Sequence, residues 1–223
     1  MKLYGSLASP FVARCWLAIT AKGGGVELAM YEGGIKSPGY LAMNPMGKMP
    51  LLVDGDVALP ESAVICEYLD AKLPGPALMP GDPAGHAMVR LLCRIADIYV
   101  FPPSVTLLRA PKDGDAGVIA EAAKNVSAAF NHLEHFLSDT GYAHGNSLTL
   151  ADCTLQTAVS LALLVMGKHG IDSKIGERPK LGRWWQTCNA NPILKPAIEK
   201  IHEEALAFRK RREEEAARQA TAG

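Results

Sequence analysis

The sequence lacks a net charge of either sign, because its 23 lysines and arginines balance its 23 aspartates and glutamates. Binding to nucleic acid or to an anionic membrane usually draws on a basic surface, which this composition does not supply. A long apolar run is also missing, since the longest, residues 161–166, is far shorter than the roughly 20 residues of a membrane-spanning helix. No apolar signal segment opens the chain. We therefore expect a cytoplasmic protein that acts on small molecules, with neither nucleic acid nor a membrane as a partner.

Paired cysteines are missing as well. The five cysteines are scattered, odd in number and without a C-x-x-C pair, which does not suit a disulfide framework or a zinc site. His132 and His135 share one helical face, but no third and fourth ligands follow them at a recognisable spacing. We therefore expect reduced, buried thiols, surface histidines and no bound metal.

What the sequence does contain is typical of a globular protein. It is 48% apolar and 21% charged, and 223 residues suffice for one large domain or two small ones.

Residues 2–5 and 26–31 are predicted strands on either side of a helix over residues 10–21, with Pro10 in its first position and Ser9 as its N-cap. The glycines at 23–25 follow a helix and precede a strand, which is the reverse of a dinucleotide-binding fingerprint.

Residues 44–69 combine a turn, a hairpin and the start of a helix. The apolar residues 50–53 and 57–59 flank Asp54-Gly55, a pair that tolerates the positive φ angles of a tight hairpin turn. A helix follows, with Ser62 as its predicted N-cap. Free N–H groups at a helix start attract a carboxylate, and Glu61 beside them could hold an ammonium, so the pair could bind the zwitterionic head of an α-amino acid. Taken alone, these two residues are better explained as a plain helix cap with an acidic first turn.

The predicted fold class is α+β with two domains. A turn or short helix near residues 37–43 completes the order βαβ followed by ββα, which is that of a thioredoxin-like domain over residues 1–76. The proline- and glycine-rich stretch that follows indicates a linker over residues 77–84. The all-helical domain over residues 85–223 has predicted helices at 84–109, bent at Pro102-Pro103, and at 116–138, 150–166, 179–190 and 193–215. Thr149 and Asp152 form a capping box at the start of the central helix.

Three motifs of this chain resemble those of cytosolic glutathione transferases. They are NPMGKMP at 44–50, PESAVICEYL at 60–69 after the hairpin, and SLTLAD at 147–152, so that the resemblance covers both domains. It implies an enzyme that transfers its co-substrate glutathione to an alkyl or aryl electrophile. It also implies a cis peptide bond before Pro50, backbone hydrogen bonds from Met49 to the cysteinyl part of glutathione, Lys48 in the same site, and Glu61 and Ser62 on the γ-glutamyl head.

The resemblance extends to the start of the first helix. Ser9-Pro10-Phe11 is similar to the serine version of the family's helix-start motif, which implies that the Ser9 hydroxyl stabilises the glutathione thiolate. A plain N-cap is the alternative role for Ser9, and Ser6 is a nearby competitor for the catalytic one. Tyr4, at the end of the first strand, is expected to pack. A thiol-exchange enzyme would need cysteine in place of Ser9, so the serine argues against that activity.

The same resemblance implies a homodimer and an apolar electrophile bound between the domains. Contacts to the electrophile are expected from Phe11 and, on the long helix, from Tyr99, Phe101 and Leu108. Asp97 could reach the glutathione of the partner subunit, or form a solvated pair with its neighbour Arg94.

Other functions of the same fold stay open. A glutathione-dependent isomerase, an ether-cleaving enzyme or a dehalogenase would share the first domain and differ only in the second site. A non-catalytic binding or scaffold protein would be expected to lose part of the set Ser9, Pro50, Glu61 and Ser62, and all four are present.

Overall fold

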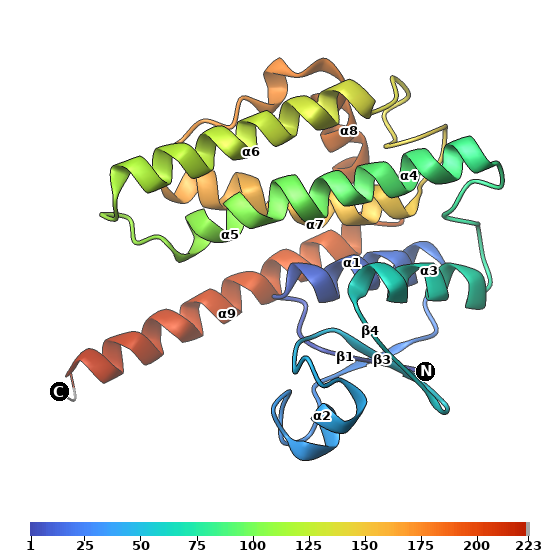
Figure 1. The fold of residues 1–223 in the computed structure, drawn as a ribbon, viewed down its shortest axis with the longest axis horizontal. Coiled ribbons are helices and arrows are strands. Elements are labelled where there is room, and N and C mark those ends of the chain that lie inside the picture. The colour runs from blue at the N-terminus through green and yellow to red at the C-terminus, as the bar shows by residue number, and fades with distance from the viewer. Residues whose placement is uncertain (222–223) are drawn as a thin grey trace. The chain divides into compact units, whose positions relative to one another are not determined.

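The computed structural model describes residues 1–221 (Figure 1). The chain forms two compact units. The first unit contains Met1–Leu73 together with the C-terminal segment from Pro192, and the second contains Pro74–Asn191. Each unit is described by itself below.

The first unit is built on a four-stranded sheet. Its strands are β1 (Lys2–Tyr4), β2 (Glu27–Ala29), β3 (Leu51–Asp54) and β4 (Val57–Pro60), in the spatial order β2-β1-β3-β4. β1 and β2 are parallel, while β3 runs antiparallel to both β1 and β4. In this register Leu3 lies opposite Leu28 and Leu52, and the side chains of Leu3 and Leu52 are fully buried in the core. The predicted βαβ–ββα order is confirmed.

Four helices complete the first unit: α1 (Pro10–Ala21), α2 (Pro38–Met43), α3 (Ser62–Lys72) and α9 (Lys195–Thr221). Figure 1 shows α1 and α3 on one side of the sheet and α2 on the other. α1 packs against α3 and against α9. Beyond the last turn of α1, the Lys22 Nζ lies 3.0 Å from Asp70 Oδ1 of α3, and both side chains are almost fully buried. This ion pair ties the C-terminal ends of α1 and α3 together.

The N-cap of α3 differs from the prediction. Ser62 is already the first helical residue, and Glu61 occupies the cap position with a φ of 68°. β4 continues to Pro60, so Glu61 alone must turn the chain from the strand into the helix. A positive φ at a residue with a side chain is unfavourable, and such residues concentrate at functional sites.

The second unit is helical throughout its regular structure. It contains α4 (Pro83–Ile95), the π-helical turn η1 (Ala96–Val100), α5 (Phe101–Arg109), α6 (Ala116–Phe136), α7 (Leu150–Lys168), the 3-10 turn η2 (Ile175–Glu177) and α8 (Pro179–Ala190). The predicted long helix is therefore interrupted one turn earlier than expected, at η1. Pro102 and Pro103 have no N–H to donate, which favours a change in the hydrogen-bonding pattern of the preceding turn.

α7 is the core helix of the second unit, and its start is anchored by Asp152. The predicted capping box is confirmed: the Asp152 carboxylate accepts from the Thr149 N–H at 2.7 Å and from its Oγ1 at 2.8 Å. It also accepts from the Ala143 N–H at 2.8 Å and the Trp184 Nε1 at 2.9 Å. Burial raises the pKa of the Asp152 carboxyl, whereas these four donors act in the opposite direction by stabilising the charged form.

Two stretches, Pro83–Arg109 and Leu150–Lys168, are long and apolar enough to cross a membrane by length and composition alone. The expectation that no segment reaches this length was therefore too strict, because helices with few charges pass the test without an unbroken apolar run. A core helix of a soluble protein passes it too, and 72% of the Leu150–Lys168 window is buried within the protein. The absence of a membrane partner stays a prediction.

Candidate active site

A cavity of about 150 Å³ in the first unit, called the first cavity below, is lined by every residue predicted to bind glutathione. Its lining consists of Phe11, Asn44, Met46, Lys48, Met49, Pro50, Pro60, Glu61 and Ser62. These residues come from the start of α1, the loop before β3, the end of β4 and the start of α3. Segments separated by up to 51 positions in the chain therefore meet around one small space.

The loop before β3 is held in place by two buried side chains. The Tyr40 hydroxyl donates to the Lys48 carbonyl at 2.6 Å, and Asn44 Nδ2 donates to the same oxygen at 2.7 Å. Burial raises the pKa of Tyr40, with a smaller opposing effect of its hydrogen bond with Asn44, so its hydroxyl remains a donor. The following peptide bond, Met49-Pro50, is cis, which confirms the expectation drawn from the family resemblance.

The sequence did not point to Tyr40 and Asn44 as part of this site. Asn44 begins the NPMGKMP motif, so its identity was a usable signal. Nothing in the local pattern around Tyr40 indicates that its hydroxyl reaches across the loop. Both residues shape the first cavity through the Lys48 backbone.

Glu61 and Ser62 form the wall of the first cavity at the start of α3. The Glu61 side chain is exposed and makes no capping hydrogen bond, while its carbonyl accepts from the Ile65 N–H at 2.9 Å as the helix begins. Ser62 is 6% exposed, and its carbonyl accepts a hydrogen bond from the Cys15 thiol at 3.6 Å. A carboxylate therefore stands beside the N–H groups of a helix start, and the two can bind opposite charges of one ligand.

Ser9 is the N-cap residue of α1, as predicted, but its side chain makes no capping hydrogen bond. Its backbone is engaged on both sides, since its N–H donates to the Ser6 carbonyl and its carbonyl accepts from the Ala13 N–H, each at 2.9 Å. The competitor Ser6 uses its hydroxyl differently, because Ser6 Oγ accepts from the Ala8 N–H at 3.2 Å. The Ser9 hydroxyl therefore does not serve the helix cap, whereas the Ser6 hydroxyl supports the local turn.

The residues predicted to contact the electrophile are not gathered in one cavity. Phe11 lines the first cavity, and the Arg14 guanidinium carbon lies 5.4 Å from the centre of its ring. Phe101 is buried, with 3% of its surface exposed, and Leu108 is exposed on α5. Tyr99 belongs to a different cavity, described next.

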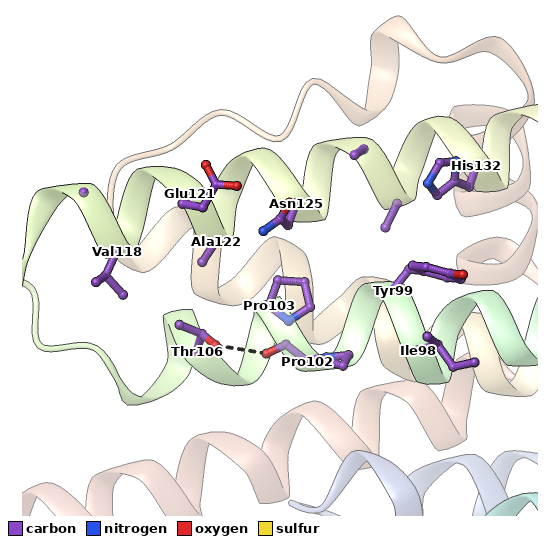
Figure 2. Close-up of a pocket in the computed structure, with 13 residues that line it drawn as sticks. Ile98, Tyr99, Pro102, Pro103, Thr106, Val118, Glu121, Ala122, Asn125 and His132 are labelled. Atoms are coloured by element: carbon purple, nitrogen blue, oxygen red, sulfur yellow. Dashed lines mark hydrogen bonds between the residues drawn. The ribbon is translucent and has the colours of Figure 1, made fainter.

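A second cavity, of about 700 Å³, lies in the second unit between the η1–α5 segment and α6. Figure 2 shows Tyr99, Pro103 and Thr106 facing Ala122, Asn125 and His132 across it. The rings of Tyr99 and His132 meet edge to face with their centres 5.6 Å apart. The apolar parts of the lining include the exposed side chains of Ile98, Tyr99 and Val118.

Three further expectations concern Tyr4, Asp97 and a bound metal. Tyr4 packs edge-on against Tyr31, with ring centres 5.1 Å apart. Asp97 lies half-buried in η1, and Arg94 is exposed on α4. Within residues 1–221, no group of three histidine, cysteine or acidic side chains is arranged to hold a metal ion.

Comparison with known proteins matches both units to described families. Residues 3–77 match the family described as Glutathione S-transferase, N-terminal domain. Residues 95–192 match the family described as Glutathione S-transferase, C-terminal domain.

Individual relatives agree with these matches. The chain is 30% identical to glutathione S-transferase 3 of Zea mays over 213 residues, which cover 90% of this chain and 94% of the relative. It is also 30% identical to a glutathione S-transferase of Pseudomonas putida over 197 residues, covering 87% and 89% of the two chains. Among solved structures, maleyl pyruvate isomerase, described as a bacterial glutathione S-transferase in Zeta class, has a TM-score of 0.71 at 28% identity, covering 88% of this chain and 96% of the other.

Proposed function

The chain belongs to the glutathione S-transferase family, and we propose that it binds glutathione in the first cavity and activates the sulfur with Ser9. As a glutathione transferase it uses glutathione as its co-substrate. The observation that carries the proposal is the lining of the first cavity, in which Lys48, Met49, Pro50, Glu61 and Ser62 lie together.

The polar groups of the first cavity match the ends of glutathione. The γ-glutamyl head carries an ammonium and a carboxylate, for which the Glu61 carboxylate and the N–H groups at the start of α3 supply the opposite charges. The second carboxylate of glutathione would pair with the Lys48 ammonium. The peptide groups between them would hydrogen-bond to the main chain of Met49, which also lines the cavity.

Glu61→Ala tests the binding of the γ-glutamyl head. Losing a charge-assisted hydrogen bond costs roughly 1.5 to 3 kcal/mol, so the dissociation constant for glutathione should rise about tenfold or more. Isothermal titration calorimetry measures this constant directly. Asp56→Ala, which removes an exposed carboxylate from the hairpin turn outside the cavity, should bind glutathione like the wild type. Unchanged affinity in Glu61→Ala would remove Glu61 from the site.

The second substrate is proposed to be an apolar electrophile. Phe11 presents an apolar ring at the first cavity, and Leu108 is exposed on α5, so both are kept as proposed contacts. Phe101 offers almost no surface, and Tyr99 lines the second cavity, which makes them weaker candidates. A glutathione-dependent isomerase is the second candidate function, because a maleyl pyruvate isomerase of the glutathione S-transferase family is 28% identical to this chain. Turnover is measured with alkyl and aryl halides and with cis-configured diacids. Turnover of the halides indicates a transferase, and conversion of the diacids to their trans isomers indicates an isomerase.

We also propose that the enzyme is a cytoplasmic homodimer in which a second copy covers the mouth of the second cavity. The exposed side chains of Ile98, Tyr99 and Val118 form an apolar surface there, and a two-fold axis would bury the same surface on both copies. Asp97 lies next to this surface in the chain, so contact with the partner's glutathione is part of the same proposal.

Light scattering at micromolar concentration should give the mass of a dimer. Ile98→Asp should shift the mass toward the monomer, because it places a charge in the apolar contact. Leu206→Asp, at an exposed position of α9, is the matched control and should stay dimeric. A monomer mass for the wild type would contradict the proposal.

A further inference from the structure

Two cysteines that lie 51 positions apart in the sequence meet in the first unit. Cys66 Sγ of α3 lies 3.9 Å from Cys15 Sγ of α1, so the two sulfur atoms are in contact. Cys15 is 0% exposed and Cys66 is 3% exposed. Both are reduced in the structure. The sequence predicted scattered thiols, whereas the packing of α1 on α3 creates a pair.

This cysteine pair lies directly behind the wall of the first cavity. The Cys15 thiol is within hydrogen-bonding distance of two carbonyl oxygens, that of Phe11 at 3.4 Å and that of Ser62 at 3.6 Å. Phe11 and Ser62 both line the first cavity. Phe11 and Ser62 therefore contact both the Cys15 thiol and the space that a small oxidant could enter.

We propose that Cys15 and Cys66 are a site of oxidative modification, at which a peroxide forms a disulfide that weakens glutathione binding. One thiol loses its proton, and the thiolate attacks a peroxide oxygen. The O–O bond breaks, the sulfur becomes a sulfenic acid, and the departing hydroxide takes up the proton that the thiol lost and leaves as water. The second sulfur then attacks the sulfenic sulfur, the S–S bond forms, the S–O bond breaks, and the hydroxide departs as water with the second thiol's proton. Two electrons pass from the thiols to the peroxide.

The disulfide affects the cavity through Ser62. A disulfide bond is about 2.05 Å long, so its formation draws the two sulfur atoms together and removes the Cys15 thiol hydrogen, for which the carbonyls of Phe11 and Ser62 are both acceptors within reach. Ser62 begins α3 and stands at the proposed site of the γ-glutamyl head. The movement of Cys15 and the loss of its thiol hydrogen behind the cavity wall should shift Ser62 and raise the dissociation constant for glutathione above that of the reduced protein. The weakening of glutathione binding rests on the proposed function, whereas the formation of the disulfide does not.

Another pair of cysteines provides an internal control. Cys153 and Cys188 are both buried in the second unit. Burial, and then the neighbouring Asp152 carboxylate, raise the pKa of the Cys188 thiol well above its ordinary value, which disfavours the reactive thiolate. Neither residue lines a cavity described above. Cys153 and Cys188 should therefore stay reduced under the conditions that oxidise Cys15 and Cys66.

The experiment treats the full-length protein with hydrogen peroxide, blocks the remaining thiols with iodoacetamide after unfolding, and maps tryptic peptides by mass spectrometry. Free thiols should fall from five to three, and residues 15–22 should be linked to residues 49–72, the tryptic peptides that contain Cys15 and Cys66. S-methylglutathione, which has no free thiol, should slow the linkage by filling the cavity. Cys66→Ala should lose the linked peptide, and Cys153→Ala should keep it, with circular dichroism confirming that both variants fold.

Five free thiols after peroxide treatment, or thiol loss without the linked peptide, would overturn the proposal. Linkage at the same rate with S-methylglutathione present would refute access through the cavity. Calorimetry on the oxidised protein tests the consequence, and unchanged glutathione affinity would refute the coupling through Ser62. A reduced wild type that does not bind glutathione at all would instead contradict the proposed function, and the linked peptide would still form.

Discussion

Ser9→Ala should lower the rate of glutathione transfer at neutral pH by roughly tenfold or more. A free cysteine thiol titrates near pH 8.5, so only a few per cent of it is the nucleophilic thiolate at about pH 7. One charge-assisted hydrogen bond of roughly 1.5 to 3 kcal/mol shifts that ionisation equilibrium by about ten- to a hundredfold. The Ser9 hydroxyl is suited to donate this bond because it makes no capping hydrogen bond to its own helix.

The direction of the pH dependence follows from the donor. Ser9 stabilises the charged thiolate and so lowers the pKa of the bound thiol. Removing the hydroxyl therefore raises the pKa of the bound thiol. The activity of Ser9→Ala should therefore recover as the pH rises toward the titration of free glutathione. Serine remains protonated throughout, because its role is to stabilise an anion rather than to act as a base.

Ultraviolet titration of bound glutathione beside the measured turnover separates this role from a structural one. Ser9→Thr keeps a hydroxyl and should retain much of the activity. Ser6→Ala, which removes the acceptor for the Ala8 N–H, should change stability more than the thiol titration. If Ser9→Ala keeps the wild-type thiol pKa and rate while Ser6→Ala loses both, the activating hydroxyl is that of Ser6. No effect in either variant would leave the activation to backbone N–H groups.

Asp152→Ala should destabilise the second unit by about 3 to 5 kcal/mol, a large part of the roughly 5 to 15 kcal/mol that stabilises a typical domain. The change leaves buried donors at Ala143, Thr149 and Trp184 without their acceptor. Each unsatisfied buried donor costs roughly 1 to 3 kcal/mol, and relaxation around the alanine offsets part of the sum.

Urea unfolding followed by circular dichroism measures this loss. Asp152→Asn keeps an acceptor of the same size and should lose less stability than the alanine variant. Asp113→Ala, at an exposed position of the same unit, should change the unfolding free energy by no more than about 0.5 kcal/mol. A loss in Asp152→Ala as small as that of Asp113→Ala would show that the capping box contributes little to the stability of α7.

Features that depend on neighbours in the chain were predictable from the sequence. The bounds of α1, Pro10–Ala21, follow from a proline at its start and the glycines after its end. The hairpin around Asp54-Gly55 follows from the turn chemistry, and the capping box of Thr149 and Asp152 from a three-residue spacing. The residues around the first cavity could be named in advance because the motifs that carry them resemble those of a known family. The cis bond before Pro50 came from that resemblance and from no local pattern.

Other features depend on which segments pack together, and only the tertiary structure decided them. The Tyr40 hydroxyl reaches the Lys48 carbonyl because α2 packs beside the loop, and the sulfur atoms of Cys15 and Cys66 meet because α1 packs on α3. Tyr99 lines one cavity and Phe11 another, and a contact of both with one substrate stays a prediction. Periodicity specifies which face of a helix is apolar, but the partner of that face is set by the packing of the whole core. The contacts of a single hydroxyl or thiol are therefore determined only when the chain has folded.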